Sequence, residues 1–213
     1  MGIQERKQRE FEKRKQLILQ TARELFSQKG FNNVTLEHIA TKIEFSKGTI
    51  YSHFESKEEI YAHLLLDHLN MLLDFLKESA RTSKSTIEGI QKCLNVYIDF
   101  YRNHKEYFQL LFFIDIFSDH YRIPQYILKR IQAQKVACLS ELQYLLKRGA
   151  KSKEISNIFS LKNVALVLWG MINGVIHLAE SKQIKPADLD KLINVGFEIV
   201  KKGLKGKTEL FKE

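Results

Sequence analysis

The chain has 213 residues with only two prolines and ten glycines, and charged residues make up 28% of it. This composition excludes a collagen-like fibre, a disordered chain and a loop-rich β-sandwich, and the length allows a sizeable buried core. The formal net charge is +9, and residues 1–57 carry eleven basic against seven acidic side chains. A basic N-terminal block favours a polyanionic partner, although charge runs more often mark a solvated face.

The first apolar stripe with helical spacing runs over about residues 10–29, and Gly30 supplies the left-handed position that ends a helix. Thr35 and Ser46 then offer N-cap oxygens for two short helices that follow them. Helices of this length are too small to form a core alone, so they must pack on the first helix. The layout predicts a helix-turn-helix.

Ser56 and Glu59 have the spacing of a capping box, and a long apolar stripe follows them to about residue 80. The later segments also have helical rather than alternating periodicity. They are expected to form helices over residues 86–103, 104–117, 124–148, 160–181 and 186–202. The sequence therefore predicts an all-α protein of nine helices without a strand.

Three stretches, Val34–Ala40, Ser46–Phe54 and Ser56–Glu58, resemble the N-terminal motif of the tetracycline repressor (TetR) family of bacterial one-component regulators. The resemblance covers about fifty residues, and the remainder is similar to the family only in helix number and length. It implies a three-helix DNA-binding domain with a basic N-terminal tail over residues 1–56. Residues 57–213 would then form a helical ligand-binding and dimerisation domain.

A recognition helix must present small or polar side chains to base edges in the major groove. Lys47 can donate to guanine and Thr49 can contact a base, while Gly48 lets the backbone approach closely. Contacts to phosphates would set the register without reading the sequence. The predicted DNA-binding residues are Thr35, Ser46, Lys47, Gly48, Thr49, Tyr51, His53 and Lys57. The alternative is that the caps are purely structural and that the segment is a solvated turn.

The turn between the two short helices departs from the family pattern. Where the family usually has a glycine, this chain has Glu44, followed by Phe45. If that position is left-handed, a residue with a Cβ atom costs about 1 kcal/mol. Replacing Glu44 with Gly should then raise the melting temperature.

Ten of the 23 aromatic residues lie between Tyr97 and Tyr126. Most are expected to fill an ordinary core, but several could line a cavity with a few polar groups, the usual composition of a small-molecule site. Trp169, Asn173 and His177 recur at intervals of four and share one helix face. The candidate ligand-binding residues are Phe100, Phe108, Phe112, Asp115, Trp169, Asn173 and His177. A buried Asn or His is, however, more often satisfied structurally.

Residues 163–179 carry no charge and contain Gly170 and Gly174, a spacing typical of membrane helices that dimerise. This segment is shorter than a membrane span and contains polar side chains, so no membrane partner is expected. Small residues on an apolar face also let two helices of a soluble dimer approach closely. The resemblance implies that this helix and the last one pair with their symmetry mates in a homodimer.

No catalytic signature is present, and the histidines and two cysteines lack metal-ligand spacing. We therefore expect a protein that is not an enzyme and that needs no cofactor or metal. The N-terminal residues lack the apolar core of a signal peptide, and the cysteines do not suggest a disulfide framework. Both features favour a cytoplasmic protein.

These features together predict a transcriptional repressor that binds double-stranded DNA at a palindromic operator and is released by an apolar small-molecule effector. One alternative is a DNA-binding protein of the same fold that is an activator or a chromosome-organising factor without an inducer. Another is a small-molecule-binding or enzymatic helical protein with a vestigial DNA motif. An accessible apolar cavity would count against the first alternative, and absent or salt-insensitive DNA binding would favour the second.

Overall fold

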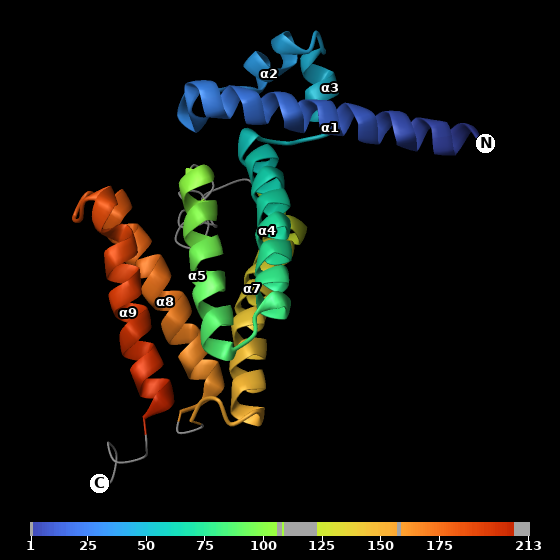
Figure 1. Ribbon diagram of the computed structural model, residues 1–213. Helices are drawn as coiled ribbons and strands as arrows, with labels where there is room; N and C mark the ends of the chain where they lie inside the picture. Colours follow the sequence, from blue (N-terminus) through green and yellow to red (C-terminus); the bar gives the residue numbers. More distant parts are fainter. Residues whose placement is uncertain (1, 106–107, 109–122, 157–158, 207–213) are drawn as a thin grey trace. The chain divides into compact units, whose positions relative to one another are not determined.

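The structure is a computed structural model that describes residues 2–105, 108, 123–156 and 159–206. Within these ranges the regular elements are all helical, which confirms the predicted all-α class (Figure 1). Most of the helix expected over residues 104–117 lies outside the described residues.

The chain forms two compact units. The first unit comprises residues 1–70 and 104–134, and the second comprises residues 71–103 and 135–213. Two helices, α4 (Lys57–Thr82) and α7 (Gln125–Lys151), contribute to both units. The boundary between the two units therefore falls inside α4, between residues 70 and 71. The apolar stripe of α4 continues across this boundary. The functional boundary before residue 57 stays a prediction.

The first unit contains the predicted helix-turn-helix. Its elements are α1 (Ile3–Lys29), the 3-10 helix η1 (Phe31–Asn33), α2 (Leu36–Lys42), α3 (Lys47–Tyr51) and the first part of α4. In Figure 1, the two short helices α2 and α3 lie on one side of α1, and α2 packs against both α1 and α3. Ile18, Ile39 and Ile50 each have an exposed fraction of 0%. One fully buried side chain from each helix thus anchors the short helices, as expected.

The start of α1 differs from the expectation. The helix begins at Ile3 rather than at about Glu10, so the basic N-terminal tail is helical. Residues 3–17 are mostly Gln, Glu, Lys and Arg, which lose little rotamer freedom in a helix. An ion pair between Arg6 and Glu10, 3.6 Å apart, supports the same turns. Because these turns carry no apolar stripe, periodicity could not detect them.

The second unit contains the rest of α4, α5 (Thr86–Asn103), the rest of α7, α8 (Leu161–Glu180), the 3-10 helix η3 (Pro186–Asp188) and α9 (Leu189–Lys205). Helices α8 and α9 lie side by side in Figure 1 and pack together. A Cβ atom on Gly196 of α9 would lie 2.2 Å from the sulfur of Met171 on α8. The lack of a side chain at Gly196 therefore allows this close packing.

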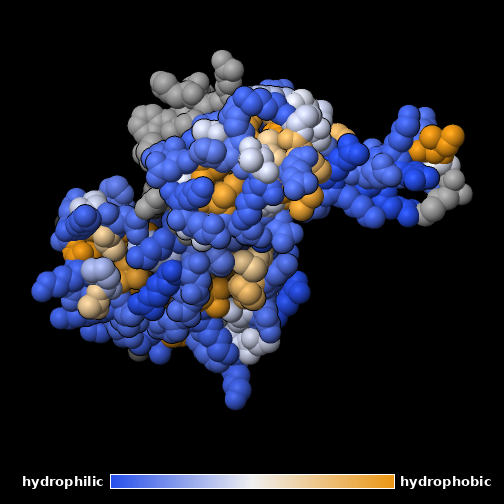
Figure 2. Space-filling model, turned by 90° about the horizontal axis from the view of Figure 1, so that it is seen from above, coloured by the Kyte–Doolittle hydropathy of each residue, from blue (hydrophilic) through white to orange (hydrophobic). Residues whose placement is uncertain are grey.

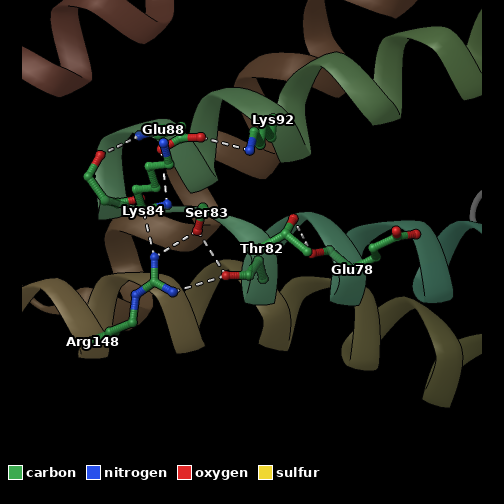
Figure 3. Close-up of polar contacts among 9 residues, drawn as sticks. Glu78, Thr82, Ser83, Lys84, Glu88, Lys92 and Arg148 are labelled. Carbon is green, nitrogen blue, oxygen red and sulfur yellow. Dashed lines mark hydrogen bonds and ion pairs between the residues drawn. The ribbon is translucent and has the colours of Figure 1, made fainter.

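Arg148 of α7 connects three helices of the second unit (Figure 3). Its guanidinium donates to the Ala80 carbonyl at 3.0 Å, to the Ser83 hydroxyl at 2.7 Å and to the Ser85 carbonyl at 3.2 Å. These acceptors lie at the end of α4 and in the turn before α5. A single cation thus adds a hydrogen bond to a carbonyl at the end of α4, to a hydroxyl in the turn and to the carbonyl before α5, and so ties the three helices together.

Among the described helices, α8 is the one that is long and apolar enough to span a membrane by length and composition, with a mean hydropathy of 1.4. This is weak evidence of a span, because a core helix of a soluble protein passes the same test. Within that apolar window, only 28% of the residues are buried in the described chain.

Candidate nucleic-acid interface

Helix α3 presents polar residues on one side and is held by apolar residues on the other. The Ser46 hydroxyl accepts a hydrogen bond from the Thr49 amide at 3.1 Å and so caps the helix as predicted. Ile50 and Phe54 are buried, with exposed fractions of 0% and 1%. The remaining surface of the helix carries the predicted reading residues Lys47, Gly48 and Tyr51, which are all exposed, with Thr49 half-buried beside them.

The turn before α3 has the left-handed conformation that the sequence suggested. Glu44 has a φ angle of 56°. The turn is closed by the Phe45 amide, which donates to the Ala40 carbonyl at 3.0 Å. A residue with a Cβ atom in this region costs about 1 kcal/mol relative to glycine. The chain nevertheless forms the tight turn that its family resemblance implied.

Lys47 has a partner that the sequence did not reveal. Its ammonium lies 3.1 Å from a carboxylate oxygen of Glu37 on α2. A hydrogen bond from the backbone amide of Glu37 itself, together with the bond from Lys47, lowers the pKa of that carboxyl. Both side chains are exposed, and exposed ion pairs contribute at most about 1 kcal/mol. Lys47 can therefore exchange the Glu37 carboxylate for a DNA acceptor at little cost.

Thr35 begins α2 through a reciprocal cap. Its hydroxyl accepts from the His38 amide, and the His38 ring nitrogen accepts from the Thr35 amide, each at 3.3 Å. The side chain of Thr35 is exposed. The hydroxyl acts as an acceptor in the cap, and a hydrogen bond from it also helps to lower the pKa of the Glu37 carboxyl, so a phosphate oxygen would have to replace that carboxylate as acceptor.

His53 lies directly beyond α3 and stacks on Phe11 of α1, with ring centroids 4.0 Å apart. Burial, followed by the nearby charges of Arg14 and Lys15, lowers its pKa from the ordinary value of 6.5. The Nδ1 atom of His53 is buried and has no hydrogen-bond partner among the described residues. The ring is therefore neutral at pH 7, and its other nitrogen is the one that can serve as a phosphate donor.

Lys57 has structural partners within the first unit. Its ammonium donates to the carbonyls of Phe31 and Val34 at 3.0 and 3.1 Å, and it lies 4.4 Å from the centre of the Phe31 ring. These contacts attach the start of α4 to the loop before α2. A contact between Lys57 and phosphate stays a prediction, and it would have to use the remaining donor of this group.

The candidate ligand-binding residues are distributed differently from the expectation of a shared cavity. Phe112 and Asp115 lie outside the described residues. Phe100 and Phe108 are buried, one in each unit. On α8, the Asn173 amide accepts a hydrogen bond from the Tyr97 hydroxyl at 2.8 Å and donates to the Trp169 carbonyl at 2.8 Å. His177 is exposed. Asn173 and Trp169 are thus engaged in contacts within the second unit.

The space beside Trp169 is small. It is lined by Leu76, Cys93, Leu94, Tyr97, Cys138, Leu142, Trp169 and Ile172 and has a volume of about 10 Å³. A cavity of this size holds about one water molecule at most. In the described part of the chain, no group of three or more His, Cys, Asp or Glu side chains could hold a metal ion.

The first unit therefore contains a short capped helix, held by a buried apolar side and preceded by a tight turn and a second short helix. This geometry defines the helix-turn-helix class of DNA-binding modules. Residues 18–64 match the family model described as "Bacterial regulatory proteins, tetR family". The match confirms the resemblance seen in the sequence for this part of the chain, which is similar to the DNA-binding module of that family.

The chain is also similar to curated bacterial regulators. It is 30% identical over 118 residues to the HTH-type transcriptional regulator YerO of Bacillus subtilis, covering 54% of this chain and 41% of YerO. It is 26% identical over 139 residues to the HTH-type transcriptional activator FasR of Mycolicibacterium smegmatis, covering 65% of this chain and 61% of FasR. The matched region thus spans less than two thirds of either relative.

Solved structures share the fold along almost the whole chain. A protein with unknown function from Rhodococcus sp. RHA1 has a TM-score of 0.74 at 15% identity, with 91% of this chain and 96% of that chain covered. The regulator FadR from Bacillus subtilis, solved in complex with stearoyl-CoA, has a TM-score of 0.66 at 18% identity, with 91% and 99% covered. The all-α fold of such regulators therefore extends beyond the DNA-binding module.

Proposed function

We propose that the protein is a DNA-binding transcriptional regulator that acts in the cytoplasm and binds a palindromic operator as a homodimer. The observation that carries this proposal is the exposure of Lys47, Gly48 and Tyr51 on a helix whose other side, Ile50 and Phe54, is buried. Two such helices, related by two-fold symmetry, would enter successive major grooves about 34 Å apart. The family match of residues 18–64 supports the same function.

The proposed DNA contacts are of two kinds, contacts to bases and contacts to phosphates. Lys47 donates to guanine, and Thr49 contacts a neighbouring base. Thr35, Tyr51 and the neutral ring of His53 donate to phosphate oxygens and set the register. Ser46 shapes the site by capping α3, since its hydroxyl is bonded to the Thr49 amide.

Exposed apolar residues on α8 and α9 support a dimer of this chain. Leu166 and Val167 on α8 have exposed fractions of 45% and 59%, and Val195 and Ile199 on α9 have 51% and 66%. A Cβ atom at Gly170 or Gly174 would contact nothing within 4 Å in the single chain. Helices α8 and α9 thus present an exposed apolar surface, on which α8 and α9 of a second copy of the chain can pack.

The dimer can be tested by placing a charge on this surface. Ile199→Glu should convert the protein to a monomer in sedimentation experiments and weaken operator binding, because one α3 alone reads only half of the site. Val136→Glu is the matched control, since Val136 lies on α7 and is 53% exposed. A dimer that survives Ile199→Glu, or that dissociates equally with both variants, would rule out this interface.

We further propose that the regulator is a repressor released by an apolar small molecule such as an acyl chain. The aromatic residues between positions 97 and 126 support an apolar effector. The stearoyl-CoA complex of FadR, which has the same fold, supports an acyl ligand. Such a ligand releases DNA only if it binds the DNA-free state more tightly than the DNA-bound state.

The first experiment is the selection of bound fragments from random-sequence DNA by the purified protein. The expected result is a palindrome whose half-sites are about one helical turn apart. Binding should weaken by at least about 100-fold between roughly 50 and 200 mM salt, because several phosphates are neutralised. Weak binding without sequence preference would contradict the operator proposal.

The effector and the direction of regulation need separate measurements. Stearoyl-CoA should lower the affinity of the protein for the selected operator, whereas free coenzyme A, the matched control, should have no effect. Transcription in vitro from a promoter that overlaps the operator should fall when the protein is added and recover with stearoyl-CoA. Tighter operator binding with the ligand would contradict release by an inducer, and stimulated transcription would identify an activator.

A further inference from the structure

We propose that residues 3–15 of α1 form a rigid helical arm that contacts the DNA backbone beside the recognition helix. This inference rests on the proposed DNA-binding function and adds a second contact surface to it. The arm consists of the turns that precede Ile18, the first buried residue of α1. All its residues are exposed except Lys15, which is half-buried. In Figure 1 these turns continue past α3, and Figure 2 shows that their surface is almost entirely hydrophilic.

Two aromatic contacts fix the arm to the end of the recognition helix. Phe11 stacks on His53 with ring centroids 4.0 Å apart, and the Lys15 ammonium lies 5.6 Å from the centre of the Phe54 ring. Phe11 is 40% exposed and lies in a segment of charged and polar residues, so core filling does not account for it. The contact instead gives the arm a fixed direction relative to α3.

The side of the arm that carries Phe11 is basic and lacks acidic residues. An α-helix turns by about 100° per residue, which places five residues of the arm within about 60° of Phe11. They are Gln4, Lys7, Gln8, Arg14 and Lys15. The three acidic residues of the arm lie about 100–120° from Phe11. They are Glu5, Glu10 and Glu12.

Lys7, Arg14 and Lys15 on this side can donate hydrogen bonds to phosphates, while Gln8 is bonded to the Glu12 carboxylate at 3.2 Å. Because Phe11 is turned towards the residues that follow α3, Lys7 lies on the same side, one helical turn further along. With a rise of about 1.5 Å per residue, Lys7 is about 6 Å beyond Phe11 and Ile3 is about 12 Å beyond it. Phosphates on one DNA strand are about 3.4 Å apart along the axis of the duplex. The arm is therefore long enough to lie beside about three or four of them.

The chain offers a matched pair of substitutions for the test. Lys7 lies about 40° from Phe11, whereas Arg9 lies about 160° away on the opposite side of the same helix. Both side chains are exposed and neither has an ion pair among the described residues, so Lys7→Ala and Arg9→Ala remove the same charge without disturbing the fold.

The measurement is fluorescence anisotropy on the selected operator with about ten flanking base pairs on each side, roughly one helical turn. Lys7→Ala should weaken binding by about three- to tenfold and reduce the slope of log K against log salt by about one. Arg9→Ala should change the affinity by less than about twofold, because its side faces away from the duplex. Phe11→Ala should also weaken binding and should reduce the further effect of Lys7→Ala, because the arm loses its fixed direction.

Equal effects of Lys7→Ala and Arg9→Ala would overturn the arm and leave only a general effect of charge. If Lys7→Ala has as little effect as is expected of Arg9→Ala, these turns are a solvated helix without a DNA contact. In both cases the wild-type protein still binds its operator, so the proposed function stands. If the wild type selects no DNA, the proposed function fails and the arm fails with it.

Discussion

The two compact units treat their polar side chains in opposite ways. In the first unit the residues predicted to read DNA, such as Lys47 and Tyr51, lie on the surface and keep donors available. In the second unit, Asn173 accepts from Tyr97 and Arg148 donates to the end of α4. Polar groups on the surface remain available for a partner, whereas polar groups that are partly buried are mostly satisfied within the protein.

The comparison also shows where sequence reasoning about sites is strong. A reading residue has to be exposed, and the helical spacing that buries Ile50 already places Gly48, about 160° away around the helix, on the outside. A ligand-binding residue has to be inside a cavity, and an apolar stripe does not distinguish a cavity from a packed core. The 10 Å³ space beside Trp169 is an example of a packed core. Four substitutions or conditions test this contrast.

The largest effect on stability is expected from Arg148→Met in the second unit. Its removal takes the donor from the Ser83 hydroxyl and one of two hydrogen bonds from the carbonyls of Ala80 and Ser85, and should cost about 2 kcal/mol of unfolding free energy. Urea denaturation measures this loss. Arg81→Met is the control, because Arg81 is exposed, and its effect should stay within about 0.5 kcal/mol. Equal losses in the two variants would contradict the role of the Arg148 contacts.

Lys47→Ala in the first unit should have the opposite effect: it should weaken operator binding and leave the stability almost unchanged. Operator affinity should fall by at least about tenfold, the equivalent of 1–3 kcal/mol for a lost base contact. The unfolding free energy should change by less than about 0.5 kcal/mol, since the pair with Glu37 is exposed. Lys42→Ala is the control, because Lys42 forms a similar exposed pair with Glu24 at 2.8 Å but lies outside α3. A loss of stability without a loss of affinity would make Lys47 a structural residue.

The first unit should also lose stability in mild acid. Burial lowers the pKa of His63 and of His68 to about 4 in the folded chain. The unfolded chain, with histidine pKa values near 6.5, therefore binds more protons between about pH 6.5 and pH 4. The stability is complete above pH 6.5 and falls as the pH drops to 4, by an amount of order 1 kcal/mol for each histidine.

Urea denaturation at several pH values measures this dependence. The double substitution His63→Gln and His68→Gln should flatten the curve between pH 6.5 and pH 4 while lowering its plateau. The cysteines of the second unit cannot contribute in this range, since burial raises the pKa of Cys93 and of Cys138 to about 12. An unchanged slope in the double variant would assign the acid sensitivity to other groups.

The smallest effect is expected from Glu44→Gly, which relieves the left-handed residue in the turn before α3. The unfolding free energy should rise by about 0.5–1 kcal/mol. The melting temperature should rise by about 1–4 °C for a chain of this size. Lys182→Gly is the control in the second unit, where φ is 59°, and it should give a similar gain without changing operator affinity. A lower melting temperature for Glu44→Gly would show that its side chain stabilises the turn.

The sequence by itself determined the local features of this protein. The caps at Thr35 and Ser46 bond to amides three residues away, so the spacing of residues along the chain is enough to predict them. The same holds for the helical periodicity that buries Ile50, whereas the left-handed conformation of Glu44 was only a condition that the family pattern raised and that the structure met. Interactions of this range do not require knowledge of the rest of the fold.

Only the tertiary structure decided which distant groups meet. Tyr97 and Asn173 are 76 positions apart, and Lys57 donates to a carbonyl 26 positions before it. Phe11 of α1 meets His53 beyond α3, and no apolar stripe announced the helical turns before Glu10. A side chain has many partners of suitable chemistry in the sequence, and packing selects among them, because each buried polar group must find a partner within the space that the helices leave.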